Sequence, residues 1–309
     1  MKICILGAGS LGSAIGGAFA LAGNDVHLVG RRAHMDAVNE RGLVMVTPHG
    51  EVTARPTGHE TAAGIGACDL VIVLCKAYDT EALMQRSAEL VGPDTMVLSL
   101  QNGLGAEEAL ARAVGAEHVV AGKTYIAGML LEPGRVQATY DCKDTYIGEV
   151  DGSMSERIRT LGTAFQDADM PCTVSDRIMG VVWDKLLANV STGAVCAITG
   201  LDYGRLYENE RLMETARAAV REGMAVAHAA GVDLAFERPE DVMDTARAGL
   251  PRSFKPSMLQ SLEKGRRTEV DVINGAVCAQ GRAHGVPTPV NDALVACVKG
   301  IELARFGAE

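Results

Sequence analysis

The chain has 309 residues, of which 48% are apolar and 22% are charged, enough apolar material for one large domain or, as we expect, two. Its formal net charge of -10 and the lack of any Lys/Arg run longer than a pair argue against a nucleic-acid partner and favour a small molecule. The eight cysteines form no CxxC pair and no zinc-ligand spacing with histidine, so we expect no metal site and reduced thiols in a cytoplasmic protein. No uninterrupted apolar run approaches the roughly 20 residues that a membrane span needs, so no membrane partner is expected either.

The first part of the chain has the pattern of a β-α-β unit. "KICIL" at residues 2–6 is a short apolar strand, the glycine-rich segment after it is helical, and "DVHLV" at 25–29 is a second strand. Further along, "DLVIVLCK" and "TMVLSLQNG" are continuous apolar runs, as expected of parallel strands buried on both faces. We therefore predict a Rossmann-like α/β domain.

From Val119 the pattern changes to shorter strands separated by turns. "VVAGKTYIAGMLL", "GRVQATY" and "DTYIGEV" are predicted as antiparallel additions at the edge of the sheet, followed by a helix near 155–169 and a last strand at "PCTVS".

Beyond Asp176 strand signals disappear and helical periodicity takes over. We predict helices at 178–199, 205–230, 239–248, 255–282 and 290–306. The predicted domains are a Rossmann NADP(H)-binding domain at 1–174 and an all-helical domain for substrate and catalysis at 175–309.

Three glycines follow the first strand in the order GxGxxG, at Gly7, Gly9 and Gly12. The first permits a tight turn, the second lets the backbone approach a pyrophosphate, and the third lets helix and strand pack closely. Amides at the start of the helix then face the phosphates, so we include Ser10 and Leu11 in the predicted dinucleotide site.

The end of the second strand indicates which dinucleotide binds. An NAD site usually carries Asp or Glu there, whereas this chain reads Gly30-Arg31-Arg32. Two guanidinium groups favour the 2′-phosphate of NADP(H), and Arg31 lies nearer the strand end. The alternative is that one or both arginines lie on a solvated turn.

A predicted buried helix carries a lysine beside its apolar face. In "VVWDKLLANVSTG", Val182, Leu186 and Val190 follow helical spacing, and Lys185 and Asn189 lie one turn apart beside them. Taken alone, such a lysine would be expected to extend its ammonium to water.

Four further segments point to a known family: "LCKAYDT", "LQNGLG", "WDKLLAN" and "PSMLQSLEKGRRTEVDVING". With the N-terminal GxGxxG, and in this order, the chain resembles the ketopantoate reductase (2-dehydropantoate 2-reductase) family over nearly its whole length. The resemblance implies that NADPH delivers a hydride to the carbonyl carbon of a branched 2-oxo acid, in pantothenate and coenzyme A synthesis. A homodimer remains possible.

The resemblance also implies catalytic roles for three residues. Lys185 matches the family's catalytic lysine, whose ammonium stabilises the developing alkoxide and supplies its proton. Glu269 matches a glutamate beside the lysine and the substrate hydroxyl, and Asn102 an asparagine near the nicotinamide. Without the resemblance, Glu269 would be an exposed helical charge and Asn102 part of a common Asn-Gly turn.

Three further residues receive binding roles in the same way. Lys76 matches a lysine on the phosphate side of the cofactor, Ser257 a serine that binds the substrate carboxylate, and Asn189 a substrate-binding asparagine.

The chain departs from the family at two substrate-binding positions. Gly193 stands where a second asparagine is common, and Leu201–Leu206 reads LDYGRL where an asparagine typically precedes Gly-Glu-Leu. Each lost hydrogen bond to a buried substrate oxygen would cost about 1 to 3 kcal/mol.

These departures leave three hypotheses open. The protein is a ketopantoate reductase, a relative that acts on a different 2-oxo or 2-hydroxy acid, or an NADP(H)-binding sensor without turnover. The presence of Lys185, Asn102 and Glu269 together argues against the sensor, because a binding module needs no proton donor.

Overall fold

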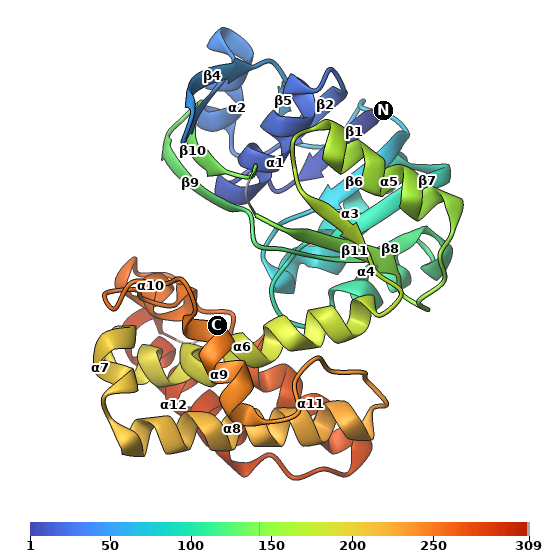
Figure 1. Cartoon of the computed structure of the whole chain (residues 1–309). Helices are drawn as coiled ribbons and strands as arrows, with labels where there is room; N and C mark the ends of the chain where they lie inside the picture. Colours follow the sequence, from blue (N-terminus) through green and yellow to red (C-terminus); the bar gives the residue numbers. More distant parts are fainter. Residues whose placement is uncertain (142, 308–309) are drawn as a thin grey trace. The chain divides into compact units, whose positions relative to one another are not determined.

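The computed structural model describes residues 1–141 and 143–307, which divide into two compact units. The first comprises Met1–Gln101 and Ala106–Ile178, and the second Asn102–Gly105 and Met179–Glu309. The first unit extends past the predicted boundary at residue 174. Ser175 donates its N–H to the carbonyl of Ile147 at 2.8 Å, and a side chain at Gly148 would collide with Ile178. The α/β fold followed by a helical half confirms the predicted fold class (Figure 1).

An eight-stranded sheet forms the centre of the first unit, in the order β12-β11-β8-β7-β6-β1-β2-β5. All of its pairings are parallel except that of β11 with β8. The strands are β1 (Lys2–Leu6), β2 (Asp25–Val29), β5 (Thr57–His59), β6 (Cys68–Val73), β7 (Val91–Ser99), β8 (Val119–Thr124), β11 (Thr145–Glu149) and β12 (Cys172–Val174). As predicted, β11 runs antiparallel to its neighbour β8. The antiparallel prediction is wrong for β8, because β8 runs parallel to β7.

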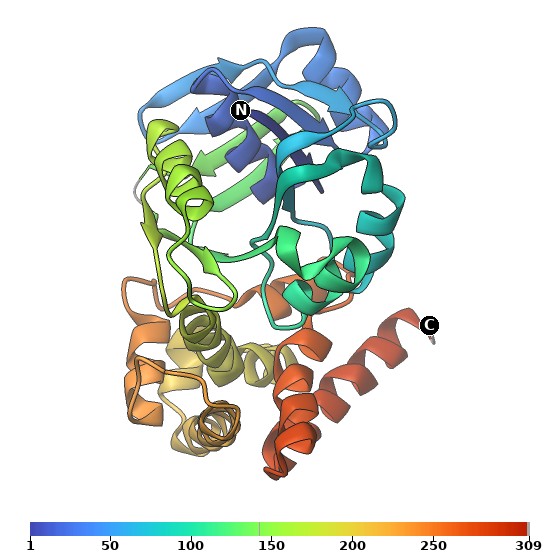
Figure 2. The same cartoon turned by 90° about the vertical axis from the view of Figure 1, so that its right-hand side faces the viewer.

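Side chains of β1 alternate between two separate apolar cores, one on each face of this sheet. Ile3 and Ile5 belong to the core under α1 (Ser10–Leu21) and α5 (Glu156–Asp167), and Cys4 and Leu6 to the core under α3 (Thr80–Arg86) and α4 (Ala106–Val114). In Figure 2 the yellow-green α5 and the blue-green α4 cover opposite faces. Both faces of β1 are therefore buried, as is usual for a central strand of a parallel sheet.

A second, four-stranded sheet has the order β4-β3-β10-β9. Its strands are β3 (Leu43–Thr47), β4 (Gly50–Ala54), β9 (Ala127–Glu132) and β10 (Arg135–Thr139). The prediction that β9 and β10 extend the main sheet is wrong, because β10 pairs with β3 instead. Met45 and Val136 of this sheet share one core with Ile15 and Phe19 of α1, so α1 packs against both sheets.

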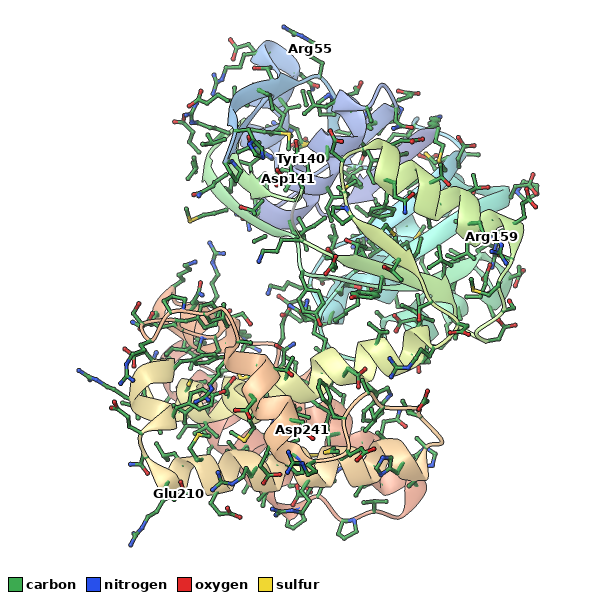
Figure 3. The ribbon with its side chains drawn as sticks, viewed as in Figure 1. Arg55, Tyr140, Asp141, Arg159, Glu210 and Asp241 are labelled. Atoms are coloured by element: carbon green, nitrogen blue, oxygen red, sulfur yellow. The ribbon has the colours of Figure 1, made fainter. Side chains whose placement is uncertain are left out.

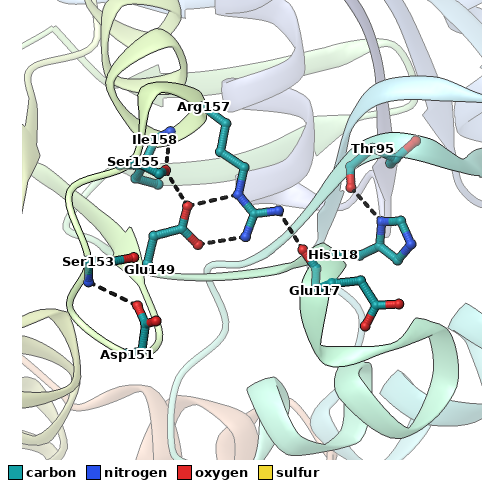
Figure 4. Close-up of polar contacts among 9 residues, drawn as sticks. All are labelled: Thr95, Glu117, His118, Glu149, Asp151, Ser153, Ser155, Arg157 and Ile158. Carbon is teal, nitrogen blue, oxygen red and sulfur yellow. Dashed lines mark hydrogen bonds and ion pairs between the residues drawn. The ribbon is translucent and has the colours of Figure 1, made fainter.

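A partly buried ion pair fixes α5 to β11. Arg157 Nε and Nη2 donate to the two carboxylate oxygens of Glu149 at 2.8 and 2.6 Å, and Ser155 donates its hydroxyl to the same group (Figure 4). Arg157 also donates to the carbonyl of Glu117 before β8. The Arg157 guanidinium and the Ser155 hydroxyl hold the pKa of Glu149 below its usual value.

The second unit is helical throughout its described residues. It contains α6 (Ile178–Thr199), α7 (Tyr203–Tyr207), α8 (Glu210–Ala229), α9 (Pro239–Arg247), α10 (Ser257–Glu263), the 3₁₀ turn η4 (Val270–Val272), α11 (Asn274–His284) and α12 (Pro289–Phe306). Charged side chains such as Glu210 on α8 and Asp241 on α9 lie at the surface of this unit, as Arg159 of α5 does on the first (Figure 3).

Two predicted helices differ from the structure. The segment 205–230 is split, because Asn209 caps a new helix by accepting the N–H of Leu212 at 3.2 Å. The segment 255–282 is also broken. Gly265 adopts a φ of +67° after α10, and the Thr268 hydroxyl accepts the N–H of Val270 at 3.2 Å to begin η4.

Helix α6 forms the core of the second unit. Val182, Leu186, Leu187 and Val190 are all at most 1% exposed, as the periodicity predicted. By length and composition α6 is also apolar enough to cross a membrane, which the sequence had not suggested, and 72% of the qualifying window is buried within the protein.

Candidate active site

The glycine loop joins β1 to α1 and has the shape of a phosphate-binding turn. Gly7 has a φ of +105°, and a Cβ there would lie 2.7 Å from the backbone N of Cys75. A Cβ on Gly9 would meet nothing within 4 Å. The loop therefore leaves open space directly before the first amides of α1, which have no partner within the helix. Ser10, Leu11 and Gly12 supply these amides, so the loop fits a dinucleotide pyrophosphate.

The side chain of Ser10 has a structural partner. Its hydroxyl oxygen accepts the N–H of Leu130 in β9 at 3.0 Å. Any contact of Ser10 with a phosphate would therefore involve its backbone amide first.

The two arginines after β2 differ in their contacts. Arg32 donates through Nε and Nη2 to the carboxylate of Glu60 at 2.6 and 2.8 Å. Arg31 is exposed and, among the residues that the structure describes, forms no ion pair. The guanidinium of Arg31 is thus the one available for an anion.

The loop that carries Lys76 runs beside the glycine loop. Leu74 donates its N–H to the carbonyl of Leu6 at 2.8 Å, and the Cys75 backbone faces Gly7. Lys76 follows as an exposed residue just before the 3₁₀ turn η1 (Ala77–Asp79). The structure therefore places Lys76 and the glycine loop at the same edge of the main sheet.

Lys185 and Asn189 occupy successive turns of α6, and both are half-buried. Leu186 and Leu187, between them, are fully buried. The pair thus forms a polar stripe at the margin of the apolar face of α6. In the described part of the chain, the Asn189 side chain makes no hydrogen bond.

Asn102 and Glu269 are brought together through their neighbours. Leu104 donates its N–H to the carbonyl of Val272 at 3.0 Å, and Gly103 packs against that residue with a φ of +90°. Glu269 begins the same 3₁₀ turn and accepts the N–H of Val272 at 3.2 Å. Segments far apart in the sequence therefore meet within the second unit.

Glu302 holds the chain in front of Glu269. Its carboxylate, 5% exposed, accepts the backbone N–H of Thr268 at 2.6 Å. No sequence motif had indicated Glu302. The local sign that could have revealed it is an acidic residue among the apolar positions of α12.

At Gly193, where the family commonly has a second asparagine, the neighbouring side chain is Met258. A Cβ there would lie 3.4 Å from Cε of Met258, an ordinary contact with a flexible side chain. Packing alone therefore does not require glycine. Ser191 donates its hydroxyl to the carbonyl of Ala188 at 2.7 Å, and the Thr192 hydroxyl lies 3.0 Å from that of Tyr203, so neither neighbour is free to substitute for an amide.

Tyr203 stands at the second departure from the family pattern. It is 7% exposed and packs edge to face against Tyr207 and Phe254, with ring centroids 5.5 and 5.0 Å away. Ser257 is exposed at the first residue of α10, next to Met258. The segments around Tyr203 and Ser257 are therefore more aromatic and apolar than the family pattern predicts.

Among the described residues, no group of three or more His, Cys, Asp or Glu side chains gathers as a metal would require. Together, a Rossmann unit with a phosphate-binding turn and a helical unit with a lysine–asparagine stripe define a dinucleotide-dependent oxidoreductase.

Comparison with known proteins identifies the family. The sequence profile described as "Ketopantoate reductase PanE/ApbA" matches residues 3–152, and its C-terminal counterpart matches residues 177–302. The chain belongs to the ketopantoate reductase family.

Similar proteins align over nearly the whole chain. The 2-dehydropantoate 2-reductase of Halobacterium salinarum is 36% identical over 97% of this chain and 98% of its own. The crystal structure of a PanE/ApbA family ketopantoate reductase from Ralstonia eutropha superimposes with a TM-score of 0.89 at 31% identity, covering 99% of both chains. D-mandelate dehydrogenase, in a ternary structure with NADH and anilino(oxo)acetate, gives a TM-score of 0.89 at 27% identity over 98% of this chain and 99% of its own.

Proposed function

We propose that this protein uses NADPH to reduce a 2-oxo acid to the 2-hydroxy acid, and that the acid is 2-dehydropantoate (ketopantoate), which yields pantoate. The observation that carries the proposal is the set of Lys185, Asn189, Asn102 and Glu269 on one helical unit of a family member. Cofactor binding is assigned to residues 1–174, and substrate binding and catalysis to 175–309 together with the segment that begins at Asn102.

The cofactor, when bound, supplies the hydride. Lys185 places its ammonium where negative charge develops on the carbonyl oxygen and donates the proton that completes the hydroxyl group. Glu269 accepts a hydrogen bond from a substrate hydroxyl, while Asn189 and Ser257 orient the acid. Asn102 orients the nicotinamide through its side-chain amide, which makes no hydrogen bond within the described chain.

The preference for NADPH rests on the contrast between the two arginines after β2. Arg32 is engaged by Glu60 in a bidentate pair, whereas Arg31 has its guanidinium available at the strand end. A guanidinium is well suited to a phosphate monoester because its donors form a planar fork. Gly7, Gly9, Gly12 and Lys76 complete the proposed cofactor site.

A second candidate is the reduction or oxidation of a bulkier acid. Gly193, covered by Met258, and the buried Tyr203 replace two amides with apolar surface. D-mandelate dehydrogenase has a similar fold and sequence, and mandelate is a 2-hydroxy acid with a phenyl group. An aromatic recognition region favours such a substrate over the hydroxylated ketopantoate.

Steady-state kinetics with NADPH and a panel of 2-oxo acids tests both candidates. A ketopantoate reductase should reduce ketopantoate with a kcat/KM of about 10⁴ M⁻¹s⁻¹ or more. At least ten-fold faster reduction of phenylglyoxylate, the ketone of mandelate, would favour the second candidate. NADPH binding without turnover of any acid would instead identify a sensor.

We further propose a cytoplasmic location. The seven cysteines that the structure describes are free, and burial raises the pKa of Cys172 and of Cys196 to about 12. Such thiols stay protonated and suit a reducing compartment. Whether the enzyme is a homodimer is tested by sedimentation of the full chain.

A further inference from the structure

Gln101, the residue before Asn102, lies at the centre of a buried polar cluster. It is 9% exposed. Its Nε2 donates to the carbonyl of Cys75 at 2.8 Å and to Thr80 Oγ1 at 2.9 Å, and its Oε1 accepts from Ser99 Oγ at 3.0 Å. One side chain thus bridges the carboxyl ends of β6 and β7.

The main chain of Gln101 is fixed as well. Its N–H donates to Ser99 Oγ at 3.2 Å, and its carbonyl accepts from Nζ of Lys123 in β8 at 2.8 Å. Lys123 is 1% exposed, and Glu107 of α4 is 7% exposed. Burial raises the pKa of Glu107, and the charge of Lys123 opposes that rise.

Burying an ammonium and a carboxyl group near a loop is costly, because both groups lose their hydration. Here the lysine satisfies the carbonyl of Gln101, two residues beyond the end of β7. The cluster therefore specifies one path for the backbone at this point, in addition to any contribution to stability.

The two segments held by Gln101 each lead into a residue of the proposed cofactor site. Cys75 precedes Lys76, and Gln101 itself precedes Asn102. We propose that Gln101 is a positioning residue for the nicotinamide cofactor, which fixes the main chain that presents Lys76 and the main chain that leads into Asn102. This inference rests on the proposed function. Lys123 contributes to the same positioning, because its buried ammonium donates to the Gln101 carbonyl.

Gln101→Met tests this role because methionine has a similar length but none of the amide's donors or acceptors. Both loops then lose their common anchor and must be ordered by the cofactor on binding. We expect the Kd for NADPH, measured by titration of its own fluorescence, to rise about ten-fold or more, as for the loss of buried hydrogen bonds. A change in stability alone would leave this Kd unaltered.

Thr95→Val is the matched control at the opposite end of the same two strands. Thr95 is 3% exposed, donates its hydroxyl to the carbonyl of Cys68 at 2.6 Å and accepts the N–H of Gly92 at 2.8 Å. Figure 4 shows this residue beside His118, whose Nδ1 lies 3.0 Å from the carbonyl oxygen of Thr95. Thr95→Val should lower the Tm without changing the Kd for NADPH.

Thr80→Val is a milder second variant for the case in which Gln101→Met does not fold. It removes one partner of the Gln101 amide and keeps the bond to Cys75, so a smaller rise in Kd is expected. The inference is supported if Gln101→Met, or Thr80→Val in its place, weakens NADPH binding while Thr95→Val does not.

Equal Kd values for the unaltered protein and all variants would overturn the inference, and the cluster would then only stabilise the fold. If the unaltered protein itself fails to bind NADPH, the proposed function fails and this inference with it. The reference titration therefore separates the two failures.

Discussion

Arg157→Met would remove the guanidinium that fixes α5 to the main sheet while keeping most of its aliphatic stem. Glu149 would lose both donors of the bidentate pair and keep only the Ser155 hydroxyl. The Glu149 side chain is 6% exposed, so water reaches it poorly, whereas the Arg157 side chain is 38% exposed.

These exposures set the size of the effect. Removing one partner of a fully buried ion pair costs about 3 to 5 kcal/mol. Because Arg157 is partly solvated, we expect roughly half of this cost, about 2 kcal/mol. In a unit of about 150 to 250 residues each kcal/mol shifts the Tm by about 2 to 4 °C, so the first unit should melt about 4 to 8 °C lower.

Scanning calorimetry of the full chain measures this shift, with Arg159→Met as the control on the same helix. Arg159 is exposed, and among the described residues its guanidinium donates only to the carbonyl of Met154, so the loss of that group should change the Tm by less than about 2 °C. Arg157 holds the pKa of Glu149 below its usual value of 4.5, so the pair stabilises the fold above that pH. The difference between the unaltered protein and Arg157→Met should therefore shrink as the pH falls from about 4.5 through the lower native pKa.

If Arg157→Met melts within about 2 °C of Arg159→Met at neutral pH, the ion pair with Glu149 does not stabilise the first unit as proposed. A large difference that does not change with acidification would also contradict the assigned cause, since protonated Glu149 cannot form the ion pair.

Three further predictions follow from the proposed site and its surroundings. Arg31→Ala should lower kcat/KM for NADPH at least about ten-fold and leave kcat/KM for NADH little changed. Arg32→Ala should change the NADPH/NADH ratio of kcat/KM less, because Glu60 already holds the Arg32 side chain. Equal use of both cofactors by the unaltered protein would refute the assignment of NADPH as the preferred cofactor. Gly193→Asn should displace Met258 and shift the kcat/KM ratio toward ketopantoate over phenylglyoxylate by about five-fold or more, and an unchanged ratio would return this position to a packing role. The Nδ1 of His34 accepts the N–H of Gly134, its Nε2 lies 2.8 Å from Ser13 Oγ, and burial lowers the pKa of its imidazole from 6.5. The Tm should therefore fall as the pH drops below about 6.5, and His34→Gln should weaken this pH dependence. An equally steep fall in the variant would exclude His34 as the source of the dependence.

Local patterns in the sequence predicted the parts of the fold that depend on local chemistry. The bounds of α6 and the burial of Val182, Leu186 and Val190 follow from helical spacing, and the β1-α1-β2 unit follows from the glycines that its turn requires. The second sheet could not be predicted in the same way. Its β3 and β10 are distant in the chain, and with five residues each they are too short to show with which sheet they pair.

The same contrast between local and long-range features applies to the candidate site. Helical geometry placed Lys185 and Asn189 on one face, and the strand end placed Arg31 at the loop. The contact of Leu104 with Val272 and the buried cluster around Gln101 join segments that are remote in sequence, so no spacing rule reveals them. Lys123, within the apolar segment "VVAGKT", was the one local sign of that cluster.

Single-turnover oxidation of NADPH by Lys185→Ala, followed by stopped-flow absorbance with the best 2-oxo acid of the panel, tests whether this lysine is the proton donor. We expect an NADPH Kd close to that of the unaltered protein and a hydride-transfer rate lower by about two to four orders of magnitude, as for the loss of a positioned acid. A Lys185→Ala enzyme that oxidises NADPH at the unaltered rate would contradict the claim and leave this lysine as a solvated side chain at the edge of α6.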